Sequence, residues 1–266
     1  MQYKNTDHTF VVCAYKDNPY LEECIRSILT QSVLGSVIIT TSTPNDSVKQ
    51  LSERCGIPLY VNPKHTGQAG DWNFGYTMAK TPLVTLCHQD DIYAPDFLKE
   101  IMASAASGER PIMIFTDYEE DHSGRLTHNS CVMRIKRGML LPLRIRPLQR
   151  NRFVRRCILA FGDPICCPAV TLNKSVLPDV PFDTHFSRCP DWEAWERFST
   201  LKGDFLYCPK RLVIHRIWDG SITSQCAEDG SRFREELKIF ERFWPHSAAK
   251  LLSRLYSTAL DTNFTD

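Results

Sequence analysis

The sequence predicts an α/β protein with a Rossmann-like, mostly parallel central sheet and helices on both of its faces. Short apolar runs alternate with stretches of helical periodicity over the first 120 residues, and a polar cluster follows most of the apolar runs. Such alternation is typical of parallel strands linked by helices. Ligands of these sheets bind beyond the carboxyl ends of the strands. The length of 266 residues suits one large domain.

Five strands are expected in this first part, because each run is short, apolar and rich in β-branched residues. They are expected at 9–15, 36–41, 57–61, 82–87 and 111–116.

Helices are expected between these strands, and their ends carry the usual signals. The first has Glu22 and Glu23 in its opening turn and Arg26 later, as the helix dipole favours. The third opens on a glycine-rich loop, and the fourth begins at a proline. The helices are expected at 20–31, 46–55, 67–80 and 95–106.

The second half of the chain is less regular. The segment GDPICCPAVTLNK indicates a loop followed by a strand, and PDWEAWERFSTLKG indicates a helix ending at Gly203. A strand is expected at 204–214, and amphipathic helix at 231–260, interrupted at Pro245.

Composition narrows the class of protein. The net charge of +1 predicts no partner by itself, and the eleven cysteines are scattered without a CxxC pair. Several lie in apolar runs, so we expect them to be buried and reduced, as in a reducing compartment. The N-terminus lacks a signal-peptide pattern and no apolar stretch is long enough to span a bilayer. We therefore expect a soluble cytoplasmic protein, at most attached peripherally to the inner face of a membrane.

The segment HQDD, residues 88–91, follows directly after the fourth expected strand. Paired carboxylates at the carboxyl end of a strand suit a hard divalent cation such as Mg²⁺ or Mn²⁺, which takes oxygen ligands and bridges phosphates. The alternative is that the acids cap the helix that follows. The pair alone does not separate these two interpretations.

Three ordered segments resemble the family 2 glycosyltransferases of GT-A fold, of the type that builds bacterial capsule and cell-wall polysaccharides. They are FVVCAYKDNPYLEECIRSILTQS, GQAGDWNFGYTMAKTPLVTLCHQDDIYAPDFL and PDWEAWERF. The resemblance covers roughly residues 8–225. It implies a GT-A domain at 1–225, with a nucleotide-sugar-binding half (1–120) and an acceptor half (121–225), followed by a helical appendage at 226–266.

The resemblance also implies a reaction. A sugar would move from a nucleotide-diphosphate sugar, a UDP-sugar in the first instance, to a hydroxyl of a glycan or lipid-linked acceptor, with inversion and with Mn²⁺ or Mg²⁺. The general base is expected to be Asp191, with Glu193 as runner-up, and Trp192 or Trp195 would line the sugar or belong to the core. The metal ligands are expected to be Asp90, Asp91 and His215. The donor contacts are expected from Ala14, Tyr15, Asp17, Thr41, Asn73, His88, Gln89 and Asp90.

The chain departs from the family pattern at three positions. His88 stands where the first acid of the aspartate motif is usual, Thr40 and Thr41 stand where acids often end the second strand, and Trp72 replaces an arginine. These departures leave two alternatives open. One is a nucleotidyltransferase using the same acids for two metals, and the other is a non-catalytic module that binds nucleotide or glycan.

Residues 122–162 contain ten Lys or Arg and no Asp or Glu. Basic residues interleaved with apolar ones suit anionic lipid or a diphosphate-linked acceptor. Nucleic acid is the competing partner, but no nucleic-acid motif is present, so we expect none. A solvated face paired with acids elsewhere is the third interpretation. For the tail helices, membrane contact, core packing and a homo-oligomer contact all remain open.

Overall fold

The computed structural model describes residues 3–218 and 231–261. Its centre is one sheet with the strand order β3-β2-β1-β4-β8-β6-β9-β5, to which β7 is added beside β6. The strands β1, β2, β3 and β4 pair in parallel, and so do β6 and β9, whereas β8 lies antiparallel between β4 and β6. The strands are β1 (His8–Ala14), β2 (Ser36–Thr41), β3 (Leu59–Val61), β4 (Leu83–His88), β5 (Ile92–Tyr93), β6 (Pro111–His122), β7 (Arg125–Thr127), β8 (Val170–Asn173) and β9 (Asp204–Ile217).

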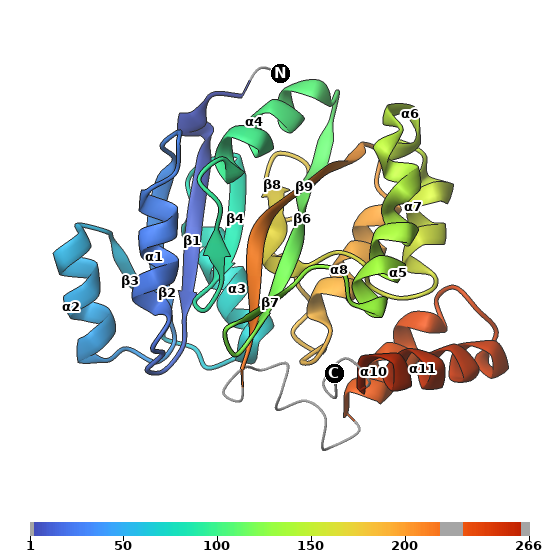
Figure 1. Ribbon diagram of the computed structural model, residues 1–266. Helices are drawn as coiled ribbons and strands as arrows, with labels where there is room; N and C mark the ends of the chain where they lie inside the picture. Colours follow the sequence, from blue (N-terminus) through green and yellow to red (C-terminus); the bar gives the residue numbers. More distant parts are fainter. Residues whose placement is uncertain (1–2, 219–230, 262–266) are drawn as a thin grey trace.

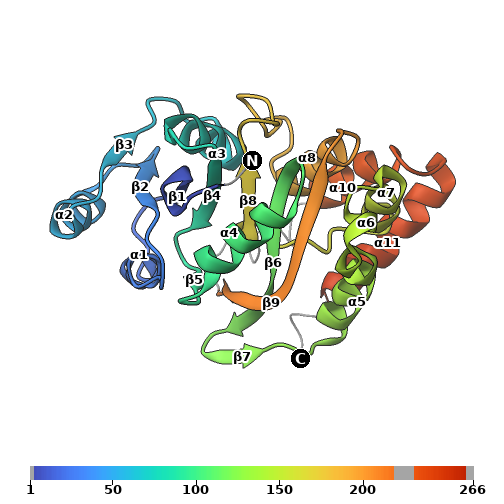
Figure 2. The ribbon, with the colours of Figure 1, turned by 90° about the horizontal axis from the view of Figure 1, so that it is seen from above.

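Helices cover both faces of this sheet. Viewed from above, α1 and α4 lie on one face, and α3 and α8 lie on the other (Figure 2). The α-helices are α1 (Leu21–Leu29), α2 (Asp46–Cys55), α3 (Gly67–Met78), α4 (Phe97–Ser107), α5 (Cys131–Leu140), α6 (Arg146–Gln149), α7 (Arg152–Leu159), α8 (Pro190–Ser199), α10 (Ser231–Phe240) and α11 (His246–Asp261). The expected mostly parallel α/β fold is thus confirmed.

The strand period explains how one sheet holds two cores. Along β1, Phe10 and Val12 point into the core under α1 and α4, whereas Val11 between them points into the core under α3 and α8. Both cores are apolar and close-packed, and the second extends to Phe240 of α10. The predicted C-terminal appendage therefore shares the main core: the Trp192 and Phe240 rings lie 4.9 Å apart.

The basic segment, residues 122–162, is the part of the chain whose secondary structure the apolar periodicity did not predict. It forms α5, the short 3-10 helix η2 (Leu141–Arg144), α6 and α7, which stand together beside β9, at the opposite end of the molecule from α2 and β3 (Figures 1 and 2). Several of its cations are paired with acids of the sheet and of α8, as in Arg137–Asp117 at 2.7 Å and Arg156–Glu196 at 2.6 Å.

Two expectations from composition can be compared with the structure. All ten cysteines in the described ranges are free, and five of them are buried. None of the helices within 3–218 and 231–261 combines the length and the apolar character that crossing a bilayer requires.

Candidate active site

Three of the predicted site residues meet at one edge of the sheet because parallel strands end together. In the register of the sheet Ala14 lies beside Thr41, and Cys13 lies beside His88. The polar loops that follow these strands therefore face a common space, as expected for a parallel sheet.

The loop after β1 is tied to the loop after β4. The Tyr15 backbone N–H donates to Gln89 Oε1 at 2.8 Å, and Gln89 Nε2 donates back to the Tyr15 carbonyl at 3.0 Å. The Gln89 side chain is thus engaged by the protein itself. The Tyr15 ring is 43 % exposed, and Asp17 is exposed as well. These two side chains are accessible to a ligand, while Gln89 positions the loop that carries them.

Asp91 is fully buried beneath this edge. Its Oδ1 accepts hydrogen bonds from His215 Nδ1 at 3.0 Å and from the Arg216 backbone N–H at 2.9 Å. Its Oδ2 lies 3.8 Å from His88 Nδ1 and has no hydrogen-bond partner in the described part of the chain. Asp91 therefore joins the ends of β4 and β9, which are 124 residues apart in sequence.

The two histidines beside Asp91 differ in charge. Burial alone would lower the pKa of His215, but the nearby Asp91, with Asp90 and Glu120, raises it to about 9. Burial lowers the pKa of His88 below its ordinary value, against the opposing charges of Asp91 and Asp90. His215 is thus the cation that pairs with Asp91. His88 is a neutral imidazole, stacked on the Trp72 ring at 5.2 Å.

Two side chains at the end of β9 bind the segment 88–91, which we call the aspartate loop. They are Arg216 and Trp218. The Arg216 guanidinium donates to the Asp90 carbonyl at 3.1 Å and to Asp121 Oδ2 at 3.2 Å, and it lies over the Tyr20 ring. Trp218 Nε1 donates to Asp90 Oδ2 at 2.9 Å. Arg216 therefore holds the backbone of the loop at Asp90, and Trp218 orients the Asp90 carboxylate.

Asp191 lies in the first turn of α8, after Pro190, and its Oδ1 accepts from the Trp192 backbone N–H at 2.9 Å. Burial raises the pKa of Asp191 above its ordinary value, against the lowering effects of Arg232 and His88. The neighbouring Asp163 also has a pKa well above the ordinary value, because it is buried and close to the charge of Asp191. A carboxylate that is costly to ionise is a stronger base once it has ionised.

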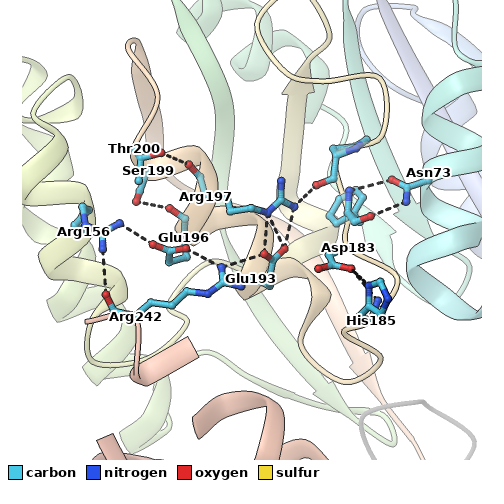
Figure 3. A network of polar contacts seen from close by, with 12 residues as sticks. Asn73, Arg156, Asp183, His185, Glu193, Glu196, Arg197, Ser199, Thr200 and Arg242 are labelled. Carbon is cyan, nitrogen blue, oxygen red and sulfur yellow. Dashed lines mark hydrogen bonds and ion pairs between the residues drawn. The ribbon is translucent and has the colours of Figure 1, made fainter. Parts of the chain in front are cut away.

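The side chain of Asn73, a predicted donor contact, is hydrogen-bonded within the protein. The Asn73 amide donates to the Phe182 carbonyl at 2.8 Å and accepts from the Phe182 N–H at 3.0 Å, and the side chain is buried (Figure 3). This reciprocal pair fixes the 182 loop to α3. Because both ends of the amide are occupied, Asn73 is not carried into the proposed donor site.

Glu193, the runner-up base, is also engaged elsewhere. It is 1 % exposed, and its carboxylate accepts from Arg197 at 2.8 Å and from Arg242 at 3.0 Å (Figure 3). Trp192 and Trp195 are each 1 % exposed and pack in the core. The idea that one of them lines a sugar is therefore wrong, and the idea that both are core residues is confirmed.

Replacing Glu193 with glutamine separates the structural role from a catalytic one. We expect the free energy of unfolding to fall by roughly 1–3 kcal/mol, because a buried charge network loses its central anion while its arginines stay partly solvated. Turnover per folded molecule should remain near that of the unmodified protein. Urea unfolding midpoints and initial rates measure the two quantities. Glu241→Gln, at an exposed position, is the matched control and should change stability by about 0.5 kcal/mol at most.

Two site residues escaped the sequence-based prediction. Asp163 is the first acid after the acid-free segment and stands between Gly162 and Pro164, a signal that was available but not used. Asp71 accepts from Ser42 Oγ at 2.6 Å and from Asn62 Nδ2 at 2.8 Å, next to the end of β2. The second strand does not end in an acid, because Thr40 and Thr41 stand there. Asp71 of α3 nevertheless places a carboxylate next to the end of this strand.

The donor chemistry of the site fits a divalent cation held mainly by phosphates. The three predicted ligands do not form a preformed cage: Asp91 Oδ1 is bonded to His215 and Arg216. In the part of the chain that the structure describes, no group of three or more His, Cys, Asp and Glu side chains is arranged to hold a metal. The Asp90 carboxylate, in contrast, is half-buried and fixed by Trp218. Mg²⁺ is commonly bound by one or two carboxylates plus substrate phosphates, which a carboxylate like Asp90 matches.

Comparisons with known proteins agree with this geometry. Residues 9–177, more than half of the chain, match the model of the family described as Glycosyl transferase family 2. Among curated proteins, none matches the chain by sequence.

Solved structures with the same fold include S. aureus TarS 1-349 in complex with UDP-GlcNAc, at 14% identity and a TM-score of 0.64, covering 92% of this chain and 70% of that one. The mannosyltransferase PcManGT from Pyrobaculum calidifontis, in complex with GDP-Man and Mn²⁺, has 14% identity and a TM-score of 0.63, covering 96% and 71%. The chain thus belongs to glycosyl transferase family 2 and is a nucleotide-sugar-dependent glycosyltransferase of GT-A fold.

Proposed function

We propose that the protein transfers a sugar, with inversion and with a divalent metal, from a nucleotide-diphosphate sugar to a hydroxyl of a glycan or lipid-linked acceptor. One observation carries this proposal: ring contacts lead from His88 to Trp72, from Trp72 to Phe182 and from Phe182 to Trp195 of α8, with centroids 5.2, 5.1 and 6.1 Å apart. In agreement, Asp191 acts on the pKa of His88 together with Asp90 and Asp91. The aspartate loop after β4 and the first turn of α8 therefore border the same site, although they lie about 100 residues apart in the sequence. A cation-binding carboxylate and a base are the two groups that the reaction requires.

The donor is proposed to be a UDP-sugar, held where β1, β2 and β4 end. Tyr15 and Asp17 offer accessible side chains, and the buried residues Ala14 and Thr41 lie side by side where β1 and β2 end. TarS binds UDP-GlcNAc and PcManGT binds GDP-Man with Mn²⁺, which supports a nucleotide sugar and a metal in proteins of this fold. The family match favours sugar transfer over the nucleotidyltransferase and non-catalytic alternatives.

The proposed step is a single displacement. Asp191 takes the proton of the acceptor hydroxyl as its oxygen forms a bond to the anomeric carbon, and the bond from that carbon to the diphosphate oxygen breaks. The nucleoside diphosphate leaves with the electron pair of that bond. A divalent cation, with Asp90 as its protein ligand, would stabilise the negative charge on the leaving diphosphate. Arg216 and Trp218 keep the Asp90 loop in position. The proposed location of this reaction is the cytoplasm.

Donor binding is tested directly by thermal denaturation with a panel of nucleotide sugars. We expect a UDP-sugar to raise the melting temperature in the presence of Mn²⁺, because a ligand that binds the native state stabilises it by mass action. At a free concentration 100 times Kd, the gain is about 2.7 kcal/mol. The gain should shrink when EDTA replaces Mn²⁺. Equal shifts for every nucleoside triphosphate, with none for nucleotide sugars, would count against the proposed donor.

The pH dependence of transfer follows from the environment of Asp191. Because burial raises the pKa of this carboxyl, and because the base must be ionised, kcat/KM should rise with pH along a limb that lies above the ordinary aspartate range of about 3.9. Stopped initial-rate assays over pH 4–9 would locate this limb. The limb should be absent from the residual activity of Asp191→Asn, and its survival in that variant would assign it to another group.

A further inference from the structure

The helices of the basic segment carry an exposed apolar surface on their outer side. Phe153 is 76 % exposed, a large fraction for a phenylalanine, and its neighbours on this surface are between 53 % and 56 % exposed. We call these residues and the arginines described below the outer helix face. Its apolar side chains are Ile135, Leu141, Ile145, Phe153 and Phe161.

A shallow apolar groove of about 490 Å³ runs through this face. It is lined by side chains from α5, η2, α6 and α7, among them Pro142, Leu148 and Phe153, and by Phe161 just after α7. Exposed apolar side chains that line a common groove mark an interaction site more strongly than single exposed residues such as Leu34 do.

The exposed charged side chains of these helices have one sign. Five cations of residues 122–162 are engaged inward: Lys136 donates to Tyr118, Arg137, Arg150 and Arg156 pair with acids, and Arg155 donates to backbone carbonyls. Four others are exposed and form no ion pair with the described residues. They are Arg134, Arg144, Arg146 and Arg152. No acid lies within the segment to neutralise them.

We propose that the outer helix face docks on an anionic lipid membrane surface, with the arginines at the headgroups and the apolar side chains below them. Each half of the pattern matches one layer of a membrane: guanidinium groups suit anionic headgroups, and aliphatic and aromatic side chains suit the acyl boundary. The exposed aliphatic side chains Ile135, Leu141 and Ile145 would gain little from the phosphates of a nucleic acid. A symmetric dimer through this face would place its arginines against one another.

The inner side of α5 carries Lys136, whose Nζ donates to Tyr118 Oη at 3.2 Å and which experiences the charge of Asp163. The helix that would rest on the membrane with its outer side thus contacts Tyr118 of β6 with its inner side. The docking proposal does not depend on the proposed function, since it concerns a separate surface and is tested without turnover.

Vesicle co-sedimentation with the full chain tests the proposal. We expect binding to vesicles of phosphatidylcholine with 50 mol% phosphatidylglycerol, little binding to phosphatidylcholine alone, and weakening as salt rises from about 0.1 to 0.5 M. Arg146→Glu/Arg152→Glu should lower the partition coefficient at least about tenfold, since each arginine near an anionic surface contributes roughly a factor of five. Phe153→Ser should lower it about tenfold through lost apolar burial.

Matched substitutions elsewhere serve as controls. Leu34→Ser removes an apolar side chain that is 72 % exposed, and Lys49→Glu/Lys80→Glu reverses two exposed charges outside the face. These variants should bind vesicles as the unmodified protein does. No binding to anionic vesicles, or equal loss in face and control variants, would overturn the proposal. So would a dimer in light scattering that Phe153→Ser converts to monomer, or salt-sensitive binding to duplex RNA that exceeds binding to vesicles.

Discussion

Asp191→Asn is expected to lower kcat for sugar transfer by ~10²–10⁴-fold, the contribution of a positioned general base. Asparagine has nearly the same shape, and its carbonyl oxygen still accepts the hydrogen bond from the Trp192 N–H. It cannot take a proton from an alcohol. Because the replaced carboxylate is partly buried and its raised pKa makes it costly to ionise, the variant should fold at least as stably as the unmodified protein.

This result is measured by initial rates with donor and acceptor, alongside urea unfolding of the same samples. Donor binding by thermal shift should be retained, because Asp191 acts on the acceptor. Asp179→Asn, an exposed aspartate on the loop before α8, is the control and should keep full activity. Unchanged turnover in folded Asp191→Asn would show that another group removes the proton.

Asp90→Asn is expected to lower kcat/KM by at least about 10²-fold, because the cation on the diphosphate contributes several kcal/mol of transition-state stabilisation. The asparagine oxygen can still accept from Trp218 Nε1, so the loop should keep its position. Unlike Asp191→Asn, this variant should lose the Mn²⁺-dependent part of the thermal shift. Raising the Mn²⁺ concentration should restore part of the activity.

Asp46→Asn, at an exposed acid in the first turn of α2, is the control for this substitution. Its activity and its Mn²⁺ response should match those of the unmodified protein. If Asp90→Asn kept the full Mn²⁺-dependent shift, the cation would have to bind through other groups.

Much of the fold follows from local pattern. The expected strand at 36–41 and helix at 46–55 occur with the predicted bounds, since periodicity and turn residues are local properties of the chain. The long strand β6 extends to His122 rather than ending at 116, because its second half pairs with β9 along a register that reaches Ile217. Such pairing is set by a distant segment and cannot be derived from the strand itself.

For the site too, local features could be predicted from the sequence, whereas contacts with distant segments could not. The aspartate loop could be located because two acids follow an apolar strand. The pairing of Asp91 with His215, 124 residues away, and of Asn73 with Phe182, 109 residues away, depends on tertiary structure. The helical spacing of Asp191, Glu193 and Trp195 did not indicate which of them faces the site. The arginines of α8 and of the segment after α10 engage Glu193, and the core takes Trp195.

The basic segment illustrates a third case. Its sequence indicates a cationic surface, but not which cations are neutralised. In the fold, Asp117, Glu196 and Asp204 neutralise three of the arginines, and the exposed remainder gathers with apolar side chains on the outer helix face. A solvated face and an interaction surface can be distinguished only when it is known which cations pair with acids, and this depends on the tertiary structure.

The central claim is that Asp90 and Asp191 border one site, the first at the diphosphate and the second at the acceptor. Crystals soaked with a UDP-sugar analogue and Mn²⁺ test it through the anomalous signal of manganese. We predict a manganese peak between the Asp90 carboxylate and the diphosphate, with the Asp191 carboxylate facing the anomeric carbon from the opposite side. A nucleotide bound away from the ends of β1 and β4, or Asp191 turned from the sugar, would contradict the account.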